Sequence, residues 1–170
     1  MKIGEVSAVI TGGASGLGLA TVREFLEKGA RVSIFDLENS NFETAATKLN
    51  EDFENRLMFS SVDVTDPKSV MVALRASIKR FGKINALVNC AGVAIAKKTT
   101  GKEGAHPLDL YRKVIDVNLV GTFNMVRLSA IEMEKNELDE HGERGCIINT
   151  ASVAAFDGQK GQAAYSASKG

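Results

Sequence analysis

Tryptophan is absent from this sequence, and its 170 residues include only two prolines and two cysteines. Two cysteines are too few for the disulfide framework that stabilises small secreted domains. Because Cys90 and Cys146 each lie in an apolar, strand-like run, we expect reduced, buried thiols and an intracellular setting. The scarcity of proline, with 44% hydrophobic and 25% charged residues, excludes a disordered chain and predicts one folded domain spanning residues 1–170.

An excess of charge of either sign is also missing, because 21 basic residues balance 21 acidic ones. The chain therefore has no basic field that would attract nucleic acid or an anionic membrane. No apolar run approaches the length of a membrane span. The N-terminal stretch MKIGEVSAVITGG reaches its first apolar run too early to hold a cleavable signal peptide. We therefore expect a soluble protein with neither nucleic-acid nor membrane partners.

Short apolar runs alternate with helical patterns along the whole chain. Strands are predicted at residues 6–10, 31–35, 58–62, 84–88 and 145–149, and a long helical pattern covers roughly residues 108–133. Strands that alternate with helices form βαβ units, whose parallel sheet is covered on both faces. Right-handed crossovers then predict a doubly wound α/β sheet, the Rossmann fold.

Local signals predict where several helices begin and end. Asp66 followed by Pro67 provides an N-cap and a first helical position. Ser40 and Glu43 have the spacing of a capping box. Gly29 is expected to end the first helix, whose inward face is predicted to carry Leu17, Ala20, Phe25 and Leu26.

The stretch TGGASGLG, residues 11–18, lies between the first strand and the first helix. Gly12 allows a sharp turn, Gly16 lets the backbone approach a pyrophosphate, and Gly18 lets the helix pack closely on the sheet. The helix N-terminus offers free N–H groups to phosphate oxygens. The loop therefore predicts a dinucleotide site, although a purely structural turn without a ligand remains the alternative.

Asp36 ends the second strand, 18 residues after Gly18. An acidic residue at this place binds the adenosine ribose hydroxyls and repels a 2′-phosphate. The next residues, Leu37 and Glu38, supply no arginine for such a phosphate. Asp36 thus favours NAD over NADP as the cofactor, unless it is a plain turn residue.

Tyr165 and Lys169 are four residues apart in the closing stretch YSASKG, so on a helix they share one face. A free tyrosine, which titrates near pH ~10, is a poor acid–base catalyst at neutral pH. A neighbouring ammonium favours the phenolate. Ser152 follows the fifth strand, at the sheet edge where such folds bind ligands. The pair alone occurs by chance on many helices, but with Ser152 and the glycine loop it predicts an acid–base site.

Two polar segments interrupt the alternation, at residues 94–106 and 134–144. They are interpreted either as solvated insertions or as contacts with substrate or with other subunits. His106 and His141 lie in these segments without the spacing of metal ligands, so we predict no metal site.

The combination of TGGASGLG, NCAG, Asn118, Ser152 and YSASK resembles the short-chain dehydrogenase/reductase family over the whole chain. Stretches such as DVNLVGTFN and INTASVAAF are similar to its mitochondrial branch of 3-hydroxyacyl-CoA dehydrogenases. The resemblance implies an NAD-dependent enzyme that interconverts a secondary alcohol and a ketone. Implied substrates are 3-hydroxyacyl-CoA thioesters, branched short-chain acyl-CoAs and hydroxysteroids. It also implies a homo-oligomer, a dimer or tetramer, and a mitochondrial location.

The same resemblance implies individual roles. Tyr165 would be the general acid/base, Ser152 would polarise the carbonyl, and Lys169 would hold the nicotinamide ribose. Asn118 would anchor a water that relays protons from Lys169. Further cofactor contacts are implied for Ser15, Leu17, Asp63, Val64, Cys90, Ala91 and Gly92. From their position between Ser152 and Tyr165, Gln159 and Gln162 either face the substrate or cap their loop.

The family places further strands and most of its substrate loop after the position of Gly170. We therefore expect a Rossmann sheet that is incomplete on its C-terminal side, with the fifth strand as an open apolar edge. Two functions follow: an NAD-dependent dehydrogenase, or a catalytically silent truncated form that retains nucleotide binding or a scaffolding role.

Overall fold

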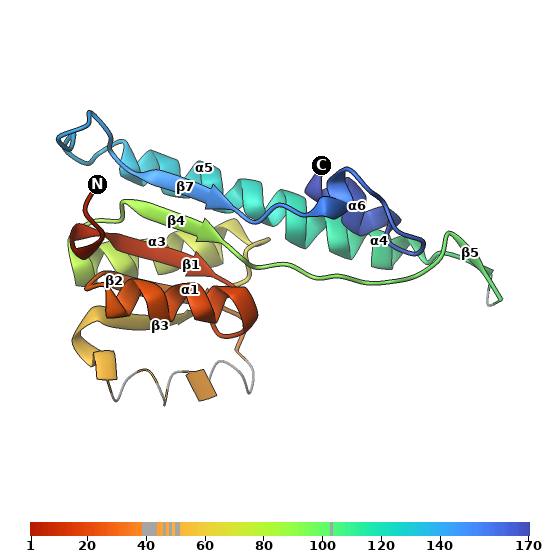
Figure 1. The fold of residues 1–170 in the computed structure, drawn as a ribbon, viewed down its shortest axis with the longest axis horizontal. Coiled ribbons are helices and arrows are strands. Elements are labelled where there is room, and N and C mark those ends of the chain that lie inside the picture. Colours follow the sequence, from red (N-terminus) through yellow and green to blue (C-terminus); the bar gives the residue numbers. More distant parts are fainter. Residues whose placement is uncertain (39–43, 46, 48, 50–51, 103) are drawn as a thin grey trace.

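A computed structural model describes residues 1–38, 44–45, 47, 49, 52–102 and 104–170. Within these residues, one parallel sheet has five strands in the order β3-β2-β1-β4-β7. This order confirms the doubly wound α/β prediction (Figure 1). The strands are β1 Ser7–Thr11, β2 Arg31–Asp36, β3 Leu57–Ser61, β4 Ala86–Asn89 and β7 Cys146–Asn149.

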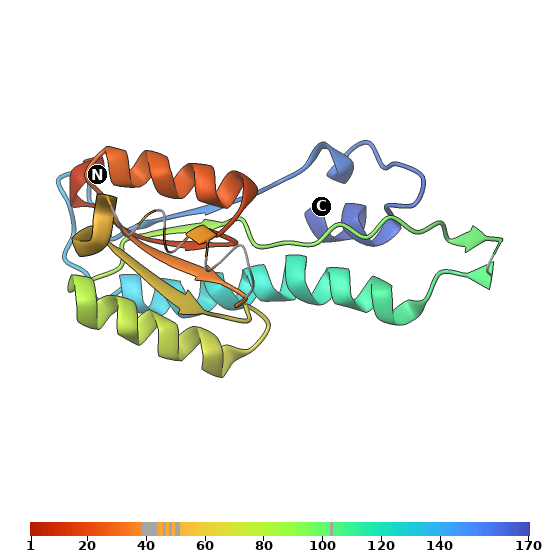
Figure 2. The ribbon, with the colours of Figure 1, turned by 90° about the horizontal axis from the view of Figure 1, so that it is seen from below.

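Helices cover both faces of the sheet (Figure 2). One face carries α1 (Gly16–Glu27), and the other carries α3 (Pro67–Phe81) with α5 (Thr122–Met133). Strand β1 shows why the strands are largely apolar. Ile10 packs in the core under α1, whereas its neighbour Val9 packs in the core under α3 and α5. Successive side chains of a strand point to opposite faces, so a sheet covered on both sides buries apolar residues on each face.

The predicted helix ends are largely confirmed. The Asp66 side chain accepts a 2.9 Å hydrogen bond from the Lys68 N–H and caps α3, with Pro67 in its first turn. Gly29 and Gly82 follow α1 and α3 with φ of 90° and 84°, conformations that favour glycine. The proposed capping box at Ser40 and Glu43 lies outside the described residues.

The predicted inward face of α1 is partly wrong. Leu17 is 71% exposed and Ala20 is exposed, whereas Val22 and Leu26 are fully buried. Gly18 decides the orientation, because a Cβ on it would lie 2.1 Å from the Gly12 carbonyl oxygen. The helix therefore turns its 18–22–26 row toward the sheet, with the usual spacing of four residues.

The long predicted helix is present, with a change of winding in its middle. It consists of α4 (Leu108–Ile115), a π-helical segment η3 (Asp116–Gly121) and α5. Together with α6 (Ala163–Lys169) and a small hairpin, α4 extends beyond the carboxyl ends of the strands (Figures 1 and 2). The hairpin, β5 (Thr100–Gly101) and β6 (Gly104–Ala105), lies within the segment 94–106 that was predicted to be a loop.

This helix corrects the expectation about membrane-length segments. From Leu108 to Met133 it is long and apolar enough to cross a membrane, by length and composition alone. One of its faces is buried in the protein, however, through residues such as Val114 and Met125. A core helix passes the same test, so the finding is weak evidence for a membrane.

Strand β7 is an edge strand, paired only with β4 among the described residues. The prediction that both cysteines are buried is therefore wrong for Cys146, which is exposed, while Cys90 is half-buried. Ile148 is 50% exposed on the same strand. The expected open apolar edge is confirmed within the part of the chain that the structure describes.

Candidate active site

A cavity of about 420 Å³ opens at the carboxyl ends of β1, β2 and β4. It brings together the glycine loop and the other predicted cofactor residues that follow these strands and β3. The predicted cofactor residues that line this cavity are Gly12, Ser15, Gly16, Leu17, Gly18, Asp36, Asp63, Val64, Cys90, Ala91 and Gly92. The sequence analysis did not identify six further lining residues, Phe35, Leu37, Val62, Val93, Lys113 and Val117.

The glycine loop has the geometry of a phosphate cradle. A Cβ on Gly12, which has φ of 64°, would lie 2.8 Å from the Ala91 nitrogen, so only glycine fits this approach. Gly16 has φ of 51° and would meet nothing within 4 Å among the described atoms, so it opens onto the cavity. Ser15 precedes α1 without a side-chain cap in the described structure, which leaves the helix N–H groups for a ligand. A dinucleotide pyrophosphate fits such a loop.

Asp36 is held rigidly at the end of β2. One carboxylate oxygen accepts a 2.9 Å bond from the Ala14 N–H, and the other accepts a 2.8 Å bond from the Leu37 N–H. Each carboxylate oxygen can accept more than one hydrogen bond, so capacity remains for ribose hydroxyls.

The far wall of the cavity is fixed by the long helix. The Val64 carbonyl accepts a 2.8 Å bond from the side-chain amide of Asn124. Gly121 makes this approach possible, because a Cβ there would lie 2.6 Å from a Val64 methyl carbon. The Asp63 carboxylate is engaged locally by the N–H and hydroxyl of Thr65, at 2.9 and 2.7 Å.

Thr11 links the two loops that meet under the cavity. Its hydroxyl oxygen accepts hydrogen bonds from the main-chain N–H groups of Cys90 and Ala91, at 3.2 and 3.1 Å. The NCAG stretch is thereby held against Gly12. Apart from its place at the end of a strand, Thr11 carries no signal in the sequence that predicts this contact.

Asn118 lies in the π-helical segment and is 3% exposed. Its side-chain oxygen accepts a 2.8 Å bond from the Val93 N–H. Its amide nitrogen donates to the Val93 carbonyl at 2.9 Å and to the Ser168 hydroxyl at 3.0 Å. Because both amide protons are used, a water held by Asn118 as predicted would have to donate to an oxygen of this residue.

Tyr165 and Lys169 both lie on α6, as predicted, with the Lys169 ammonium 5.9 Å from the centre of the Tyr165 ring. The ammonium donates a 2.8 Å hydrogen bond to the Thr150 carbonyl. Ser152 begins the short 3₁₀ turn η4 (Val153–Ala155), and its oxygen accepts from the Ala154 N–H at 3.2 Å. Helix α6 packs against both η4 and α4. Ser152, Tyr165 and Lys169 are not among the described residues that line the 420 Å³ cavity. Helix α6 is linked to that wall through Asn118, which bonds both Ser168 and the cavity residue Val93.

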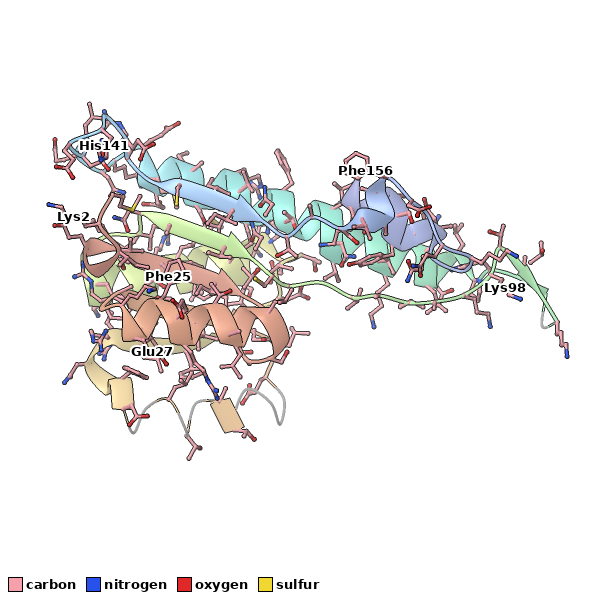
Figure 3. The ribbon with its side chains drawn as sticks, in the orientation of Figure 1. Lys2, Phe25, Glu27, Lys98, His141 and Phe156 are labelled. Atoms are coloured by element: carbon pink, nitrogen blue, oxygen red, sulfur yellow. The ribbon has the colours of Figure 1, made fainter. Side chains whose placement is uncertain are left out.

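Gln159 and Gln162 lie in the loop that leads to α6. The Gln162 N–H donates a 3.0 Å bond to the Gln159 carbonyl, so main-chain groups close this turn. The Gln162 side chain does not cap α6 in the described structure, although the residue occupies the N-cap position. Near them, Phe156 is 95% exposed and stands clear of the ribbon (Figure 3).

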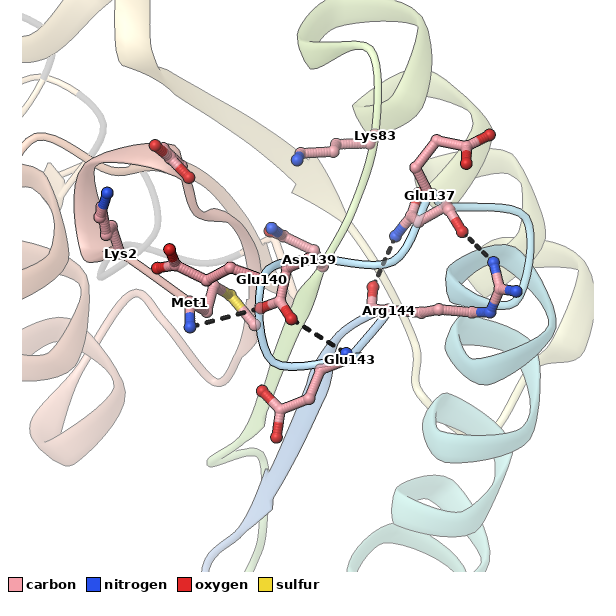
Figure 4. Close-up of a pocket in the computed structure, with 11 residues that line it drawn as sticks. Met1, Lys2, Lys83, Glu137, Asp139, Glu140, Glu143 and Arg144 are labelled. Atoms are coloured by element: carbon pink, nitrogen blue, oxygen red, sulfur yellow. Dashed lines mark hydrogen bonds and ion pairs between the residues drawn. The ribbon is translucent and has the colours of Figure 1, made fainter.

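A second hollow, of about 240 Å³, lies at the opposite end of the strands, against the 134–144 loop (Figure 4). Its walls carry charges of both signs, including the Met1 ammonium 3.3 Å from the Asp139 carboxylate. Asp139 also accepts hydrogen bonds from the N–H groups of Glu143 and His141, both at 2.9 Å. These N–H groups, together with the Met1 ammonium, hold the pKa of the Asp139 carboxyl below its usual value. The loop is thus organised by its own contacts, and the predicted site residues lie elsewhere.

Comparisons with known proteins agree with this geometry. The chain is 54% identical over 165 residues to 3-hydroxyacyl-CoA dehydrogenase type-2 of Bos taurus, and 54% identical to that of Homo sapiens. The alignment covers 96% of this chain but 62% of either relative, so the chain spans less than two thirds of their length. The crystal structure of 3-hydroxyacyl-CoA dehydrogenase type-2 from Mycobacterium avium matches with a TM-score of 0.87 and 37% identity, covering 97% of this chain and 64% of that one.

A more distant structure, sorbitol-6-phosphate 2-dehydrogenase from Erwinia amylovora, matches with a TM-score of 0.82 and 32% identity. The match covers 95% of this chain and 60% of the chain in that structure. Residues 6–170 match the family described as short chain dehydrogenase. The chain therefore belongs to the short-chain dehydrogenase family.

Proposed function

We propose that the protein is an NAD-dependent oxidoreductase that interconverts 3-hydroxyacyl-CoA and 3-oxoacyl-CoA thioesters. The observation that carries the proposal is the cavity at the strand ends, which the glycine loop and Asp36 line, and the Tyr165–Lys169 pair on α6 supports it. The names of the relatives that are 54% identical support the acyl-CoA substrate class.

The glycine loop and the N-terminus of α1 would hold the pyrophosphate of the cofactor. Asp36 would accept hydrogen bonds from the adenosine ribose, and its charge would disfavour the 2′-phosphate of NADP. The bound nicotinamide supplies or accepts the hydride. Cys90, Ala91 and Gly92 would contribute backbone surface, because Thr11 holds this stretch against the glycine loop.

Tyr165 would give its phenolic proton to the substrate oxygen during reduction and take it back during oxidation. The Lys169 ammonium, one helical turn away, would stabilise the phenolate and bind the nicotinamide ribose. Ser152 would hydrogen-bond the same substrate oxygen from η4. Asn118 would hold the water that returns protons toward Lys169. Gln159 and Gln162 would contact the substrate.

Several wider properties belong to the same proposal. Hydroxysteroids are a second substrate class, the assembly is a homo-dimer or tetramer, and the location is mitochondrial. The alternative is a catalytically silent form that retains dinucleotide binding or a scaffolding role.

An NADH-oxidation assay with acetoacetyl-CoA, run on the protein and on Tyr165→Phe, tests the proposal. We expect turnover that the substitution lowers by at least about a hundredfold, the usual range for loss of a general acid. A Tyr165→Phe protein as active as the parent would remove Tyr165 from its role. NADH binding by fluorescence with no turnover in either protein would establish the non-catalytic alternative.

A further inference from the structure

Helix α6 carries two catalytic candidates, and it packs against α4 and η4. The buried contacts of α6 therefore determine where these two side chains lie. Ala164 and Ser168 are its buried residues.

Ser168 links α6 to the π-helical segment by hydrogen bonds. It is 6% exposed, and its hydroxyl oxygen accepts a 3.0 Å hydrogen bond from the Asn118 amide. The same hydroxyl donates a 2.8 Å bond to the main-chain carbonyl of Tyr165. Because the single hydroxyl proton is directed at Tyr165, the lone pairs are left to face Asn118.

The chain of bonds continues beyond Asn118. That side chain uses its oxygen and its second amide proton on the two main-chain groups of Val93, which lines the 420 Å³ cavity. A continuous path of hydrogen bonds thus runs from the wall of the cofactor cavity, through the π-helical segment, to the main chain of Tyr165. The partners are buried or partly buried, where an unmade hydrogen bond is costly.

We infer that Ser168 is a positioning residue, whose hydroxyl sets how α6 sits against Asn118 and so aligns Tyr165 and Lys169 with the cofactor cavity. The expected effect on turnover rests on the proposed function. The hydrogen bond between Ser168 and Asn118 is a property of the fold alone. Lys169, through its bond to the Thr150 carbonyl, would secure the other side of the same helical turn.

The test compares Ser168→Ala with Ser166→Ala. Both substitutions remove a hydroxyl from α6 and introduce the best helix former. The Ser166 hydroxyl is buried and has no hydrogen-bond partner in the described structure, so it is a matched control. Ser168→Cys keeps a weaker donor and acceptor, and serves also if the alanine variant does not fold.

In Ser168→Ala we expect a kcat about tenfold lower, since small misplacements of reacting groups are costly, with the KM for NADH changed less than about twofold. Ser168→Cys should lie between the parent and Ser168→Ala, and Ser166→Ala should match the parent. Hydrogen–deuterium exchange of the Ser166 and Gly170 amides, which bond to the Gln162 and Ser166 carbonyls, should be about fivefold faster in Ser168→Ala.

Unchanged exchange and kcat in Ser168→Ala would overturn the inference, as would an equal loss in Ser166→Ala. Exchange needs no turnover, so it separates this inference from the proposed reaction. Faster exchange in Ser168→Ala, together with no turnover in the parent protein, would sustain the positioning role of Ser168 and reject the proposed reaction.

Discussion

The carboxylate of Asp36, at the end of β2, accepts a 2.9 Å hydrogen bond from the main-chain N–H of Ala14, in the middle of the glycine loop. One side chain therefore both shapes the phosphate cradle and presents a negative charge to the cavity. The two roles can be partly separated, because an asparagine carries no charge but keeps one oxygen that can accept from Ala14, while it loses the acceptor for Leu37.

We predict that Asp36→Asn lowers the preference for NADH over NADPH by about tenfold, which corresponds to about 1.4 kcal/mol. Asp36→Asn can keep one of the two main-chain hydrogen bonds, so it should lose less stability than Asp36→Ala, which breaks both at about 1 kcal/mol each. Asp36→Ala should lose the same cofactor preference. Fluorescence titration with both cofactors and thermal unfolding provide the measurements. An Asp36→Asn protein with unchanged preference would contradict the role of the charge.

Replacement of a loop glycine by alanine is expected to affect stability differently at Gly18 and at Gly16. Gly18→Ala should prevent the native loop from forming, because its Cβ would lie 2.1 Å from the Gly12 carbonyl oxygen. Gly16→Ala meets no atom within 4 Å and should cost only about 1–2 kcal/mol from its φ of 51°. Thermal unfolding and NADH titration of both variants check this order. Equal stability of the two would show that the close contact at Gly18 is relieved in solution.

Asp139 is expected to make a pH-dependent contribution to the free energy of unfolding. Its pKa is lowered in the folded protein from the ordinary 3.8, chiefly by the Glu143 and His141 N–H groups. The contribution is therefore present above pH ~4 and is lost as the pH falls through the folded-state value. Asp139→Asn keeps an acceptor for the N–H groups but removes the charge, so it should be less stable than the parent at pH 7.

The difference in unfolding free energy between parent and Asp139→Asn should shrink between pH 5 and pH 2. Urea denaturation at a series of pH values measures it, with Glu137→Gln as a control that removes an exposed charge from the same loop. A difference in unfolding free energy that does not change with pH would show that the charge of Asp139 does not stabilise the loop.

Cys146 is exposed, yet we predict slow alkylation. Its pKa is raised from 9.0, first by desolvation and then by the negative charge of Glu143, so little thiolate is present at neutral pH. In a Cys90→Ser background, the rate with iodoacetamide at pH 7.5 should be below that of the urea-unfolded protein. Glu143→Gln should raise the folded-state rate by roughly twofold. A folded rate that exceeds the unfolded one would contradict the raised pKa.

Much of the fold was predictable because its signals are local. The apolar runs of the five strands, the Asp66 cap and the glycine spacing each depend on a few neighbouring residues, and the structure has them as expected. The inward face of α1 was partly missed, since the contact of Gly18 with Gly12 overrides the hydrophobicity of Leu17.

The contacts that fix the candidate site join distant parts of the chain and leave little trace in the sequence. The Asn118–Ser168 bond spans 50 residues, and the bond from Lys169 to Thr150 depends on a main-chain carbonyl that any residue possesses. The π-helical winding around Asn118 was equally hidden, because its sequence DVNLVG continues an ordinary helical pattern.

The central place of β1 has a consequence for how the chain acquires its structure. Ser7, at the start of β1, donates a hydrogen bond to the Asn85 side chain, 78 residues later. At a synthesis rate of about 5–20 residues per second, β4 follows β1 from the ribosome after roughly 4–16 s. During that interval the apolar strand SAVIT can pair on one side only, with β2. The earliest strand to be made is thus among the last to be enclosed, and the unpaired edge of a nascent β1–β2–β3 sheet is where misassembly would begin.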